Sequence, residues 1–213
     1  MYTVAVRTFL VAILACLPLL QAQDSRLLKS VEPRYETFSP ELTMDFVASN
    51  ASVTLTVLAN GKPLSLDRSS LPLPLAVVMA LQDYEFQPQG ATQHGRPETE
   101  APTHQVTLEV PVRRSKNPSQ PALHVNPGVS KGLLVRQVRP EYSEYARHNR
   151  IQGTVTLDAH VTEQGTVGSL EVRSGPLALI EAAYSAVQQW QYRPYLLNRE
   201  PVEWASEIQI AFN

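Results

Sequence analysis

The chain has 213 residues, enough for one or two small domains, and 43% of them are hydrophobic, which is ordinary for a globular protein. Eighteen basic residues against 20 acidic ones give a formal net charge of −2. This balance argues against a nucleic-acid-binding protein, because such proteins usually carry a basic excess on one face.

The first 22 residues predict an export signal. Arg7 precedes an apolar run of about a dozen residues, and Ala22 offers a small residue for cleavage. The run is shorter than the roughly 20 residues that a membrane-spanning helix needs. We therefore favour a cleaved signal peptide (1–22) over a short uncleaved anchor. A third interpretation is a lipoprotein acylated at Cys16, the only cysteine. All three place the body of the protein across the inner membrane.

Residues 31–112 carry the signals of a small α+β domain. Alternation of apolar and polar residues predicts strands, and Asn-Gly is a strong hairpin signal because both residues tolerate positive φ. A longer apolar run predicts a helix. In chain order these are a strand, a hairpin turn, a returning strand, a helix and a last strand, at 52–58, Asn60-Gly61, 62–66, 73–81 and 106–110.

The stretch 113–131 predicts an extended linker. It contains Pro118, Pro121 and Pro127 and lacks apolar periodicity. Its small basic cluster is expected to be solvated, because a membrane-surface patch usually needs more basic residues.

Residues 132–213 give the clearest pattern. A short strand or extended arm near 133–135 is followed by a short helix over 143–149, in which Tyr145 and Ala146 can face inward. The rest predicts a hairpin, a helix and a last strand, which together make two helices on one face of a small antiparallel sheet. These elements are expected at 154–161, 167–173, 177–187 and 203–212.

The order of signals in the first domain repeats in the second at a nearly constant offset. Pro33-Arg34-Tyr35 corresponds to Pro140-Glu141-Tyr142, Gly61 corresponds to Gly165, and 84–88 corresponds to 190–194. We interpret this as two copies of one domain, the first degenerate.

Three phrases of the second copy, at these separations, resemble the C-terminal domain of the TonB family. They are Pro140-x-Tyr142, Ile151-x-Gly153-x-Val155 and Trp190-x-Tyr192-x-Pro194. The resemblance implies an α+β fold of two small TonB C-terminal-like domains (31–112 and 132–213), each a short antiparallel sheet with two helices on one face.

The resemblance also implies a function. In that family the domain lies in the periplasm and pairs an edge strand with an extended segment of an outer-membrane transporter, while an inner-membrane anchor couples it to a proton-driven motor. Backbone groups then provide the affinity. Carried onto this chain, the pairing strand is 207–212, and 136–141 is a further contact segment. The predicted partner-binding residues are Arg136, Gln137, Arg139, Glu207, Ile208, Gln209, Ile210 and Phe212. The side chains of Ile208, Ile210 and Phe212 are expected to pack in the core, leaving their backbone groups for the partner.

The chain departs from a transducer in two ways, since its anchor is marginal and its only linker lies between two domains. A free or lipid-anchored periplasmic adaptor fits these features better. The alternative hypothesis is an envelope-assembly or structural protein that uses the same edge strand to form a homodimer, because unpaired strand edges readily pair.

The sequence predicts a binding module and not an enzyme. Its five histidines fall in different elements without metal-ligand spacing, and it contains no phosphate loop, nucleophile elbow or HExxH phrase. We expect no cofactor and no metal. Tyr142, Trp190 and Tyr192 are expected to pin helices to the sheet, so their polar tips need hydrogen-bond partners.

Overall fold

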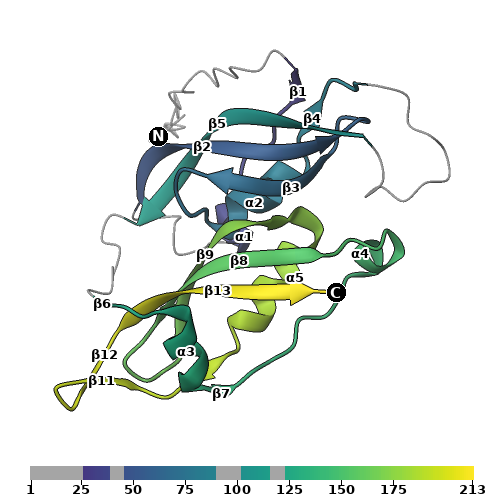
Figure 1. Ribbon diagram of the computed structural model, residues 1–213. Helices are drawn as coiled ribbons and strands as arrows, with labels where there is room; N and C mark the ends of the chain where they lie inside the picture. Colours follow the sequence, from purple (N-terminus) through teal and green to yellow (C-terminus); the bar gives the residue numbers. More distant parts are fainter. Residues whose placement is uncertain (1–25, 39–45, 90–101, 116–122) are drawn as a thin grey trace, which may run out of the picture.

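The computed structural model of the protein describes residues 26–38, 46–89, 102–115 and 123–213 (Figure 1). The predicted signal segment, 1–22, and Cys16 lie outside the described residues. Within the described ranges, no helix is both long enough and apolar enough to cross a membrane.

The first half of the chain follows the predicted order, with longer strands than expected. Gly61 makes the hairpin turn at a φ of +88°, and the Asn60 side chain accepts a hydrogen bond from the backbone N–H of Lys62. The elements are β1 (Leu27–Lys29), α1 (Tyr35–Phe38), β2 (Phe46–Leu58), β3 (Pro63–Ser69), α2 (Leu75–Gln82), β4 (Glu85–Phe86) and β5 (Thr103–Ser115).

The second half contains the predicted hairpin, helix and last strand, together with short elements that the sequence analysis did not predict. The unpredicted elements are β6 (Leu123–His124), α3 (Pro127–Leu133), β10 (Gln191–Tyr192), β11 (Tyr195–Leu197) and β12 (Glu200–Val202). The predicted ones are β7 (Leu134–Arg136), α4 (Glu144–His148), β8 (Gly153–Val161), β9 (Val167–Pro176), α5 (Leu177–Val187) and β13 (Trp204–Phe212).

Helix capping explains where the short helices α3 and α4 begin. Asn126 accepts a hydrogen bond from the N–H of Gly128, and Pro127 occupies the first turn of α3. Ser143 caps α4 by accepting from the N–H of Ala146. Ala146 is fully buried as predicted, but Tyr145 is 51% exposed, so the prediction that it faces inward is wrong.

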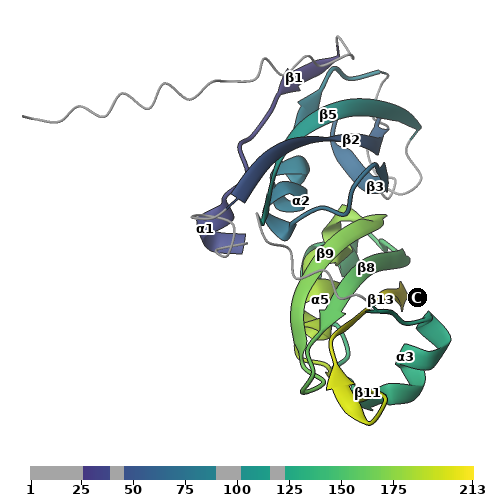
Figure 2. The same cartoon turned by 90° about the vertical axis from the view of Figure 1, so that its left-hand side faces the viewer.

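One sheet runs through both halves, where two separate short sheets were predicted. Its strand order is β5-β2-β3-β9-β8-β13-β6. The halves meet where β3 pairs with β9 antiparallel, through Ser65 with Pro176 and Leu66 with Gly175 (Figure 2). The range predicted as an extended linker, 113–131, also contributes regular structure, because β5 extends into it and α3 begins in it.

The junction between the halves is reinforced beyond the sheet. Leu73 and Val172 exchange two backbone hydrogen bonds, each of 2.7 Å. The Gln82 amide donates to the carbonyl of Leu177 at 2.9 Å, which links the end of α2 to the start of α5. Both helices lie behind the sheet in Figure 1, and the buried apolar side chains of the two halves form one core cluster. The two halves therefore form a single packed unit.

The halves nevertheless use the same local geometry. β1 pairs with β4 in the first half, as β7 pairs with β10 in the second. The Gly61 carbonyl accepts from the N–H of Phe86 at 2.9 Å, and the Gly165 carbonyl accepts from the N–H of Tyr192 at 2.7 Å. Both glycines have positive φ. In each half the hairpin turn is thus fastened to the strand that follows the helix.

Candidate partner-binding edge

The inner face of β13 belongs to the core. Ile208, Ile210 and Phe212 are 3–7% exposed, in agreement with the packing role predicted for their side chains. Opposite them, β8 contributes buried Leu157 and Val155 in an unbroken antiparallel register. The Phe212 ring also meets the Tyr142 ring edge to face, with centroids 5.1 Å apart. This contact fixes the end of the strand against the segment that precedes α4.

The direction of the backbone groups of β13 follows from one hydrogen bond. The Ala205 carbonyl accepts from the N–H of Val125 at 2.8 Å, so Ala205 points its backbone away from β8. Backbone direction alternates along a strand. Glu207, Gln209 and Ala211 therefore point their N–H and C=O groups outward as well. No described strand pairs with this outer side of β13 beyond Ala205.

This alternation corrects the predicted site. The backbone groups of Ile208, Ile210 and Phe212 point toward β8 and belong to its ladder, so they are not available to a partner. Ala211, which the sequence analysis did not select, has outward backbone groups. Glu207 and Gln209 were selected, and their backbone groups point outward at the open edge. The Glu207 side chain is half-exposed and the Gln209 side chain is exposed.

The N-terminal end of the edge is closed by the chain itself. β6 pairs with β13 in parallel, through Leu123 with Trp204 and His124 with Ala205. The chain then turns into α3, and the buried Ser206 hydroxyl donates to the Ser130 hydroxyl at 3.0 Å. These contacts leave 207–212 open, which is the range predicted for the pairing strand.

The other predicted contact residues lie on a different part of the fold. Arg136 belongs to β7 and pairs with Gln191 of β10, in a two-stranded sheet separate from the seven-stranded one. Gln137 and Arg139 follow it and are exposed. Between them, the Val138 carbonyl accepts from the Trp190 indole N–H at 2.8 Å, the partner that we predicted this side chain would need. At the far end of the segment, the Tyr142 ring contacts Phe212 of β13.

Charged side chains cover the exposed face beside the edge. Arg173 donates to both carboxylate oxygens of Asp158, at 2.9 and 2.6 Å, and its Nε lies 4.0 Å from Glu207. The hydrogen bond to Asp158 raises the pKa of Arg173. Burial raises the pKa of Glu171, although Arg114 lies 3.4 Å away. A strand added at the edge would run alongside Glu207 and Gln209, which are themselves joined by a 2.9 Å hydrogen bond.

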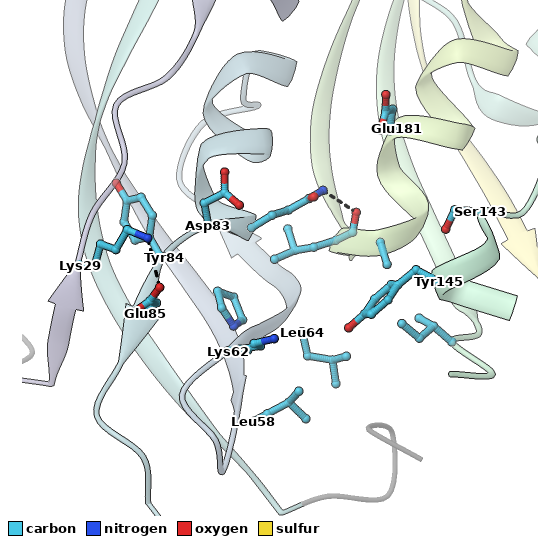
Figure 3. Close-up of a pocket in the computed structure, with 15 residues that line it drawn as sticks. Lys29, Leu58, Lys62, Leu64, Asp83, Tyr84, Glu85, Ser143, Tyr145 and Glu181 are labelled. Atoms are coloured by element: carbon cyan, nitrogen blue, oxygen red, sulfur yellow. Dashed lines mark hydrogen bonds and ion pairs between the residues drawn. The ribbon is translucent and has the colours of Figure 1, made fainter. Parts of the chain in front are cut away.

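A cleft of about 500 Å³ lies between the halves, away from this edge. Figure 3 shows Lys62 and Leu64 on one side of it and Tyr145, Ser143 and Glu181 on the other. Its charged groups have both signs. This arrangement does not select one class of ligand.

Comparison with known proteins places the open edge in a defined domain. Residues 138–213 match the family model described as the Gram-negative bacterial TonB protein C-terminal. The C-terminal part of the chain, which includes β8, β9, α5 and β13, therefore belongs to the TonB C-terminal family.

At the level of individual proteins, the chain is similar to "Protein TonB" of Vibrio cholerae serotype O1. The two are 32% identical over 107 residues, which are 46% of this chain and 44% of that protein. The chain thus spans less than half the length of this curated relative. No solved structure matches it.

Proposed function

We propose that this chain is a periplasmic, TonB-like binding protein linked to energy-dependent transmembrane transport. It binds an extended segment of an outer-membrane TonB-dependent transporter, which adds as a strand to the edge of β13. The observation that carries the proposal is the open edge at 207–212, located inside the residues that match the TonB C-terminal model.

The chemistry of this edge suits strand addition and not catalysis. Glu207, Gln209 and Ala211 offer outward N–H and C=O groups at alternate positions, and an extended peptide satisfies such groups regardless of its own sequence. The Glu207 and Gln209 side chains then provide selectivity, because cross-strand pairs contribute about 0.2–1 kcal/mol each. Within this proposal, residues 31–112 are a degenerate copy of the same domain.

The test uses a pair of substitutions at one position. Gln209→Pro removes an outward N–H that the β8 ladder does not use, so the fold is retained while strand addition is impaired. Gln209→Ala removes only the side chain and keeps the N–H. We would measure binding of labelled peptides, taken from extended periplasmic segments of outer-membrane transporters, by fluorescence anisotropy.

We expect the proline variant to bind about tenfold or more weakly, since loss of one hydrogen bond and the added clash amount to at least ~1.4 kcal/mol. The alanine variant should bind within about threefold of the parent, given the small value of one side-chain pair. Equal binding by the proline variant and the parent, with the unfolding midpoint unchanged, would exclude this edge as the site.

A further inference from the structure

The seven-stranded sheet has a second edge, at β5, on the opposite end from β13. Among the described strands, β5 pairs with β2 alone, through an unbroken register from Leu58 with Thr103 to Phe46 with Ser115. The N–H of Arg113 donates to the Tyr35 hydroxyl at 2.8 Å, so Arg113 points its backbone away from β2. By alternation, the backbone groups of Thr103, Gln105, Thr107 and Glu109 also point outward.

The two ends of this outer edge differ in how they are protected. Toward the C-terminal end, Pro111 has no N–H to offer, and the Tyr35 ring and hydroxyl cover Arg113. From Thr103 to Glu109, no described strand pairs with the outward backbone groups. Natural proteins usually blunt such edges with charged residues, proline, a bulge or a covering segment. Within 103–109 the one such feature is the charged Glu109 at its end, so the outward groups of Thr103, Gln105 and Thr107 can accept a second strand.

We propose that this edge is a homodimer interface, in which β5 of one copy pairs antiparallel with β5 of a second copy across a two-fold axis at Thr107. In this register Thr107 lies opposite Thr107 of the second copy, and Gln105 lies opposite Glu109. The acidic side chain of the open stretch therefore faces an amide donor and not its own copy, which would be repulsive.

The boundaries of the open stretch fit the same register. Thr103 lies opposite Pro111, so the missing N–H of the proline removes only one bond at each end of the ladder. Arg113, which Tyr35 covers, falls beyond the last pair. The pairing forms about eight backbone hydrogen bonds. Because the two-fold axis is perpendicular to the sheet, the exposed faces of both copies stay on the same side.

The edge is chemically suited to an isologous contact and remains separate from the β13 edge. Thr103, Gln105 and Thr107 are exposed and uncharged. Thr107 is held by a 3.1 Å contact between its hydroxyl and that of Thr54, and the Gln105 amide donates to Asp67 at 3.2 Å. These contacts order the side chains before a second copy arrives, which reduces the entropy lost on association.

Cysteine trapping in the full chain tests the register directly. In a Cys16→Ser background, Thr107→Cys brings two sulfur-bearing residues opposite each other at a Cα separation of about 5.5 Å, within disulfide range. Gln105→Cys alone places the two residues roughly 14 Å apart along the ladder, out of disulfide range. The double variant with Gln105→Cys and Glu109→Cys restores facing pairs. We expect oxidised dimers from the first and third proteins and none from the second.

Sedimentation velocity then tests whether the interface forms without a cross-link. We expect a concentration-dependent dimer with a Kd on the order of micromolar, since a single strand pair is smaller than a standard ~1,600 Å² interface. Thr107→Pro should give a monomer, and Thr107→Ala should still dimerise. Pro111 already occupies an outward position of the same strand, so the strand tolerates proline there.

The β13 variant Gln209→Pro separates this proposal from the proposed function. It should lose peptide binding and keep the dimer. A parent protein that stays monomeric at all concentrations would overturn the proposal. So would a dimer that Gln209→Pro abolishes and Thr107→Pro leaves intact, or a cross-link that forms as readily at Gln105 as at Thr107.

Discussion

Replacing Gly165 with alanine is expected to destabilise the protein strongly, because the turn between β8 and β9 has no room for a methyl group. A Cβ at Gly165 would lie 2.0 Å from the carbonyl oxygen of Tyr192. The obstruction is backbone, so no side chain can rotate away from it. The residue also has a φ of +82°, a conformation that side chains other than glycine rarely adopt.

The size of the effect can be estimated from these two observations. A left-handed conformation costs an alanine about 1–2 kcal/mol. Relief of the clash moves the turn away from Tyr192 and breaks the hydrogen bond that the Gly165 carbonyl accepts at 2.7 Å, for about 1 kcal/mol more. We therefore expect Gly165→Ala to lower the free energy of unfolding by ~2–3 kcal/mol or more.

Urea unfolding of the full chain measures this loss, and two further substitutions serve as controls. Gly61→Ala meets the Phe86 carbonyl oxygen at 2.1 Å with φ +88°, so it should cost about as much as Gly165→Ala. Gly132→Ala lies in α3 with nothing within 4 Å, and it should be neutral or stabilising by up to ~1 kcal/mol. A change below about 0.5 kcal/mol for Gly165→Ala would refute the close approach of turn and strand.

Three other expected outcomes follow from the contacts around β13 and the junction. Trp190→Phe removes the donor to the Val138 carbonyl and should lower the free energy of unfolding by about 1–3 kcal/mol. We also expect faster amide hydrogen exchange over 136–141, and unchanged exchange would refute the anchoring role of Trp190. Burial raises the pKa of Tyr192 well above its ordinary value, so the native state favours the protonated phenol. The stability contributed by this group is present below pH 10 and is lost as pH rises further, by at most about 1.4 kcal/mol per pH unit. Tyr192→Phe should therefore lose less stability in alkali than the parent, and parallel urea-midpoint curves would contradict this. Burial also raises the pKa of Glu171, so its stabilising contribution is lost as pH rises through its native pKa. Glu171→Gln should then be as stable as the parent at neutral pH, or more stable by a few tenths of a kcal/mol, and should lose that advantage in acid. A loss above 1 kcal/mol at neutral pH would show that the Arg114 pair outweighs the burial.

Much of the fold could be predicted because the strands alternate cleanly. Val155, Leu157, Ala159 and Val161 occur at every second position and are all buried. The hairpin turn at Gly165 was predicted from a glycine between two alternating segments, and the helix at 177–187 was predicted from its apolar stripe. The short elements could not be predicted, since β6 and β10 have two residues each and are defined by their partners. In α3, the capping residues Asn126 and Pro127 were a local signal that the proline-rich surroundings concealed.

The joining of the two halves into one sheet depends on contacts between distant segments. β3 and β9 pair through only two residue pairs, and one of the four residues is Pro176, which lacks an N–H. Local pattern assigns both segments to strands but does not state which edges meet. Gly175 also has to be glycine for a reason outside its own segment, because a Cβ there would lie 2.9 Å from the Val155 Cα of β8. Such a constraint arises from tertiary packing and is not visible in hydrophobic periodicity.

The candidate site shows a further limit with a definite geometric cause. In a strand of L-residues, the side that a side chain occupies also determines the direction of that residue's backbone groups. Burial of Ile208 and Ile210 therefore fixes their N–H and C=O groups on one lateral side of β13. The sequence predicts the burial, but it does not state whether β8 or the open edge lies on that side. The structure places β8 there, so Glu207, Gln209 and Ala211 hold the free groups. The same relation assigns the free groups of β5 to Thr103, Gln105, Thr107 and Glu109. On β13 and on β5, the residues whose side chains are exposed or half-exposed are also those whose backbone groups face a possible partner strand. Gln209→Pro therefore removes an outward N–H at the β13 edge, and Thr107→Pro removes one at the β5 edge, so each variant tests one edge.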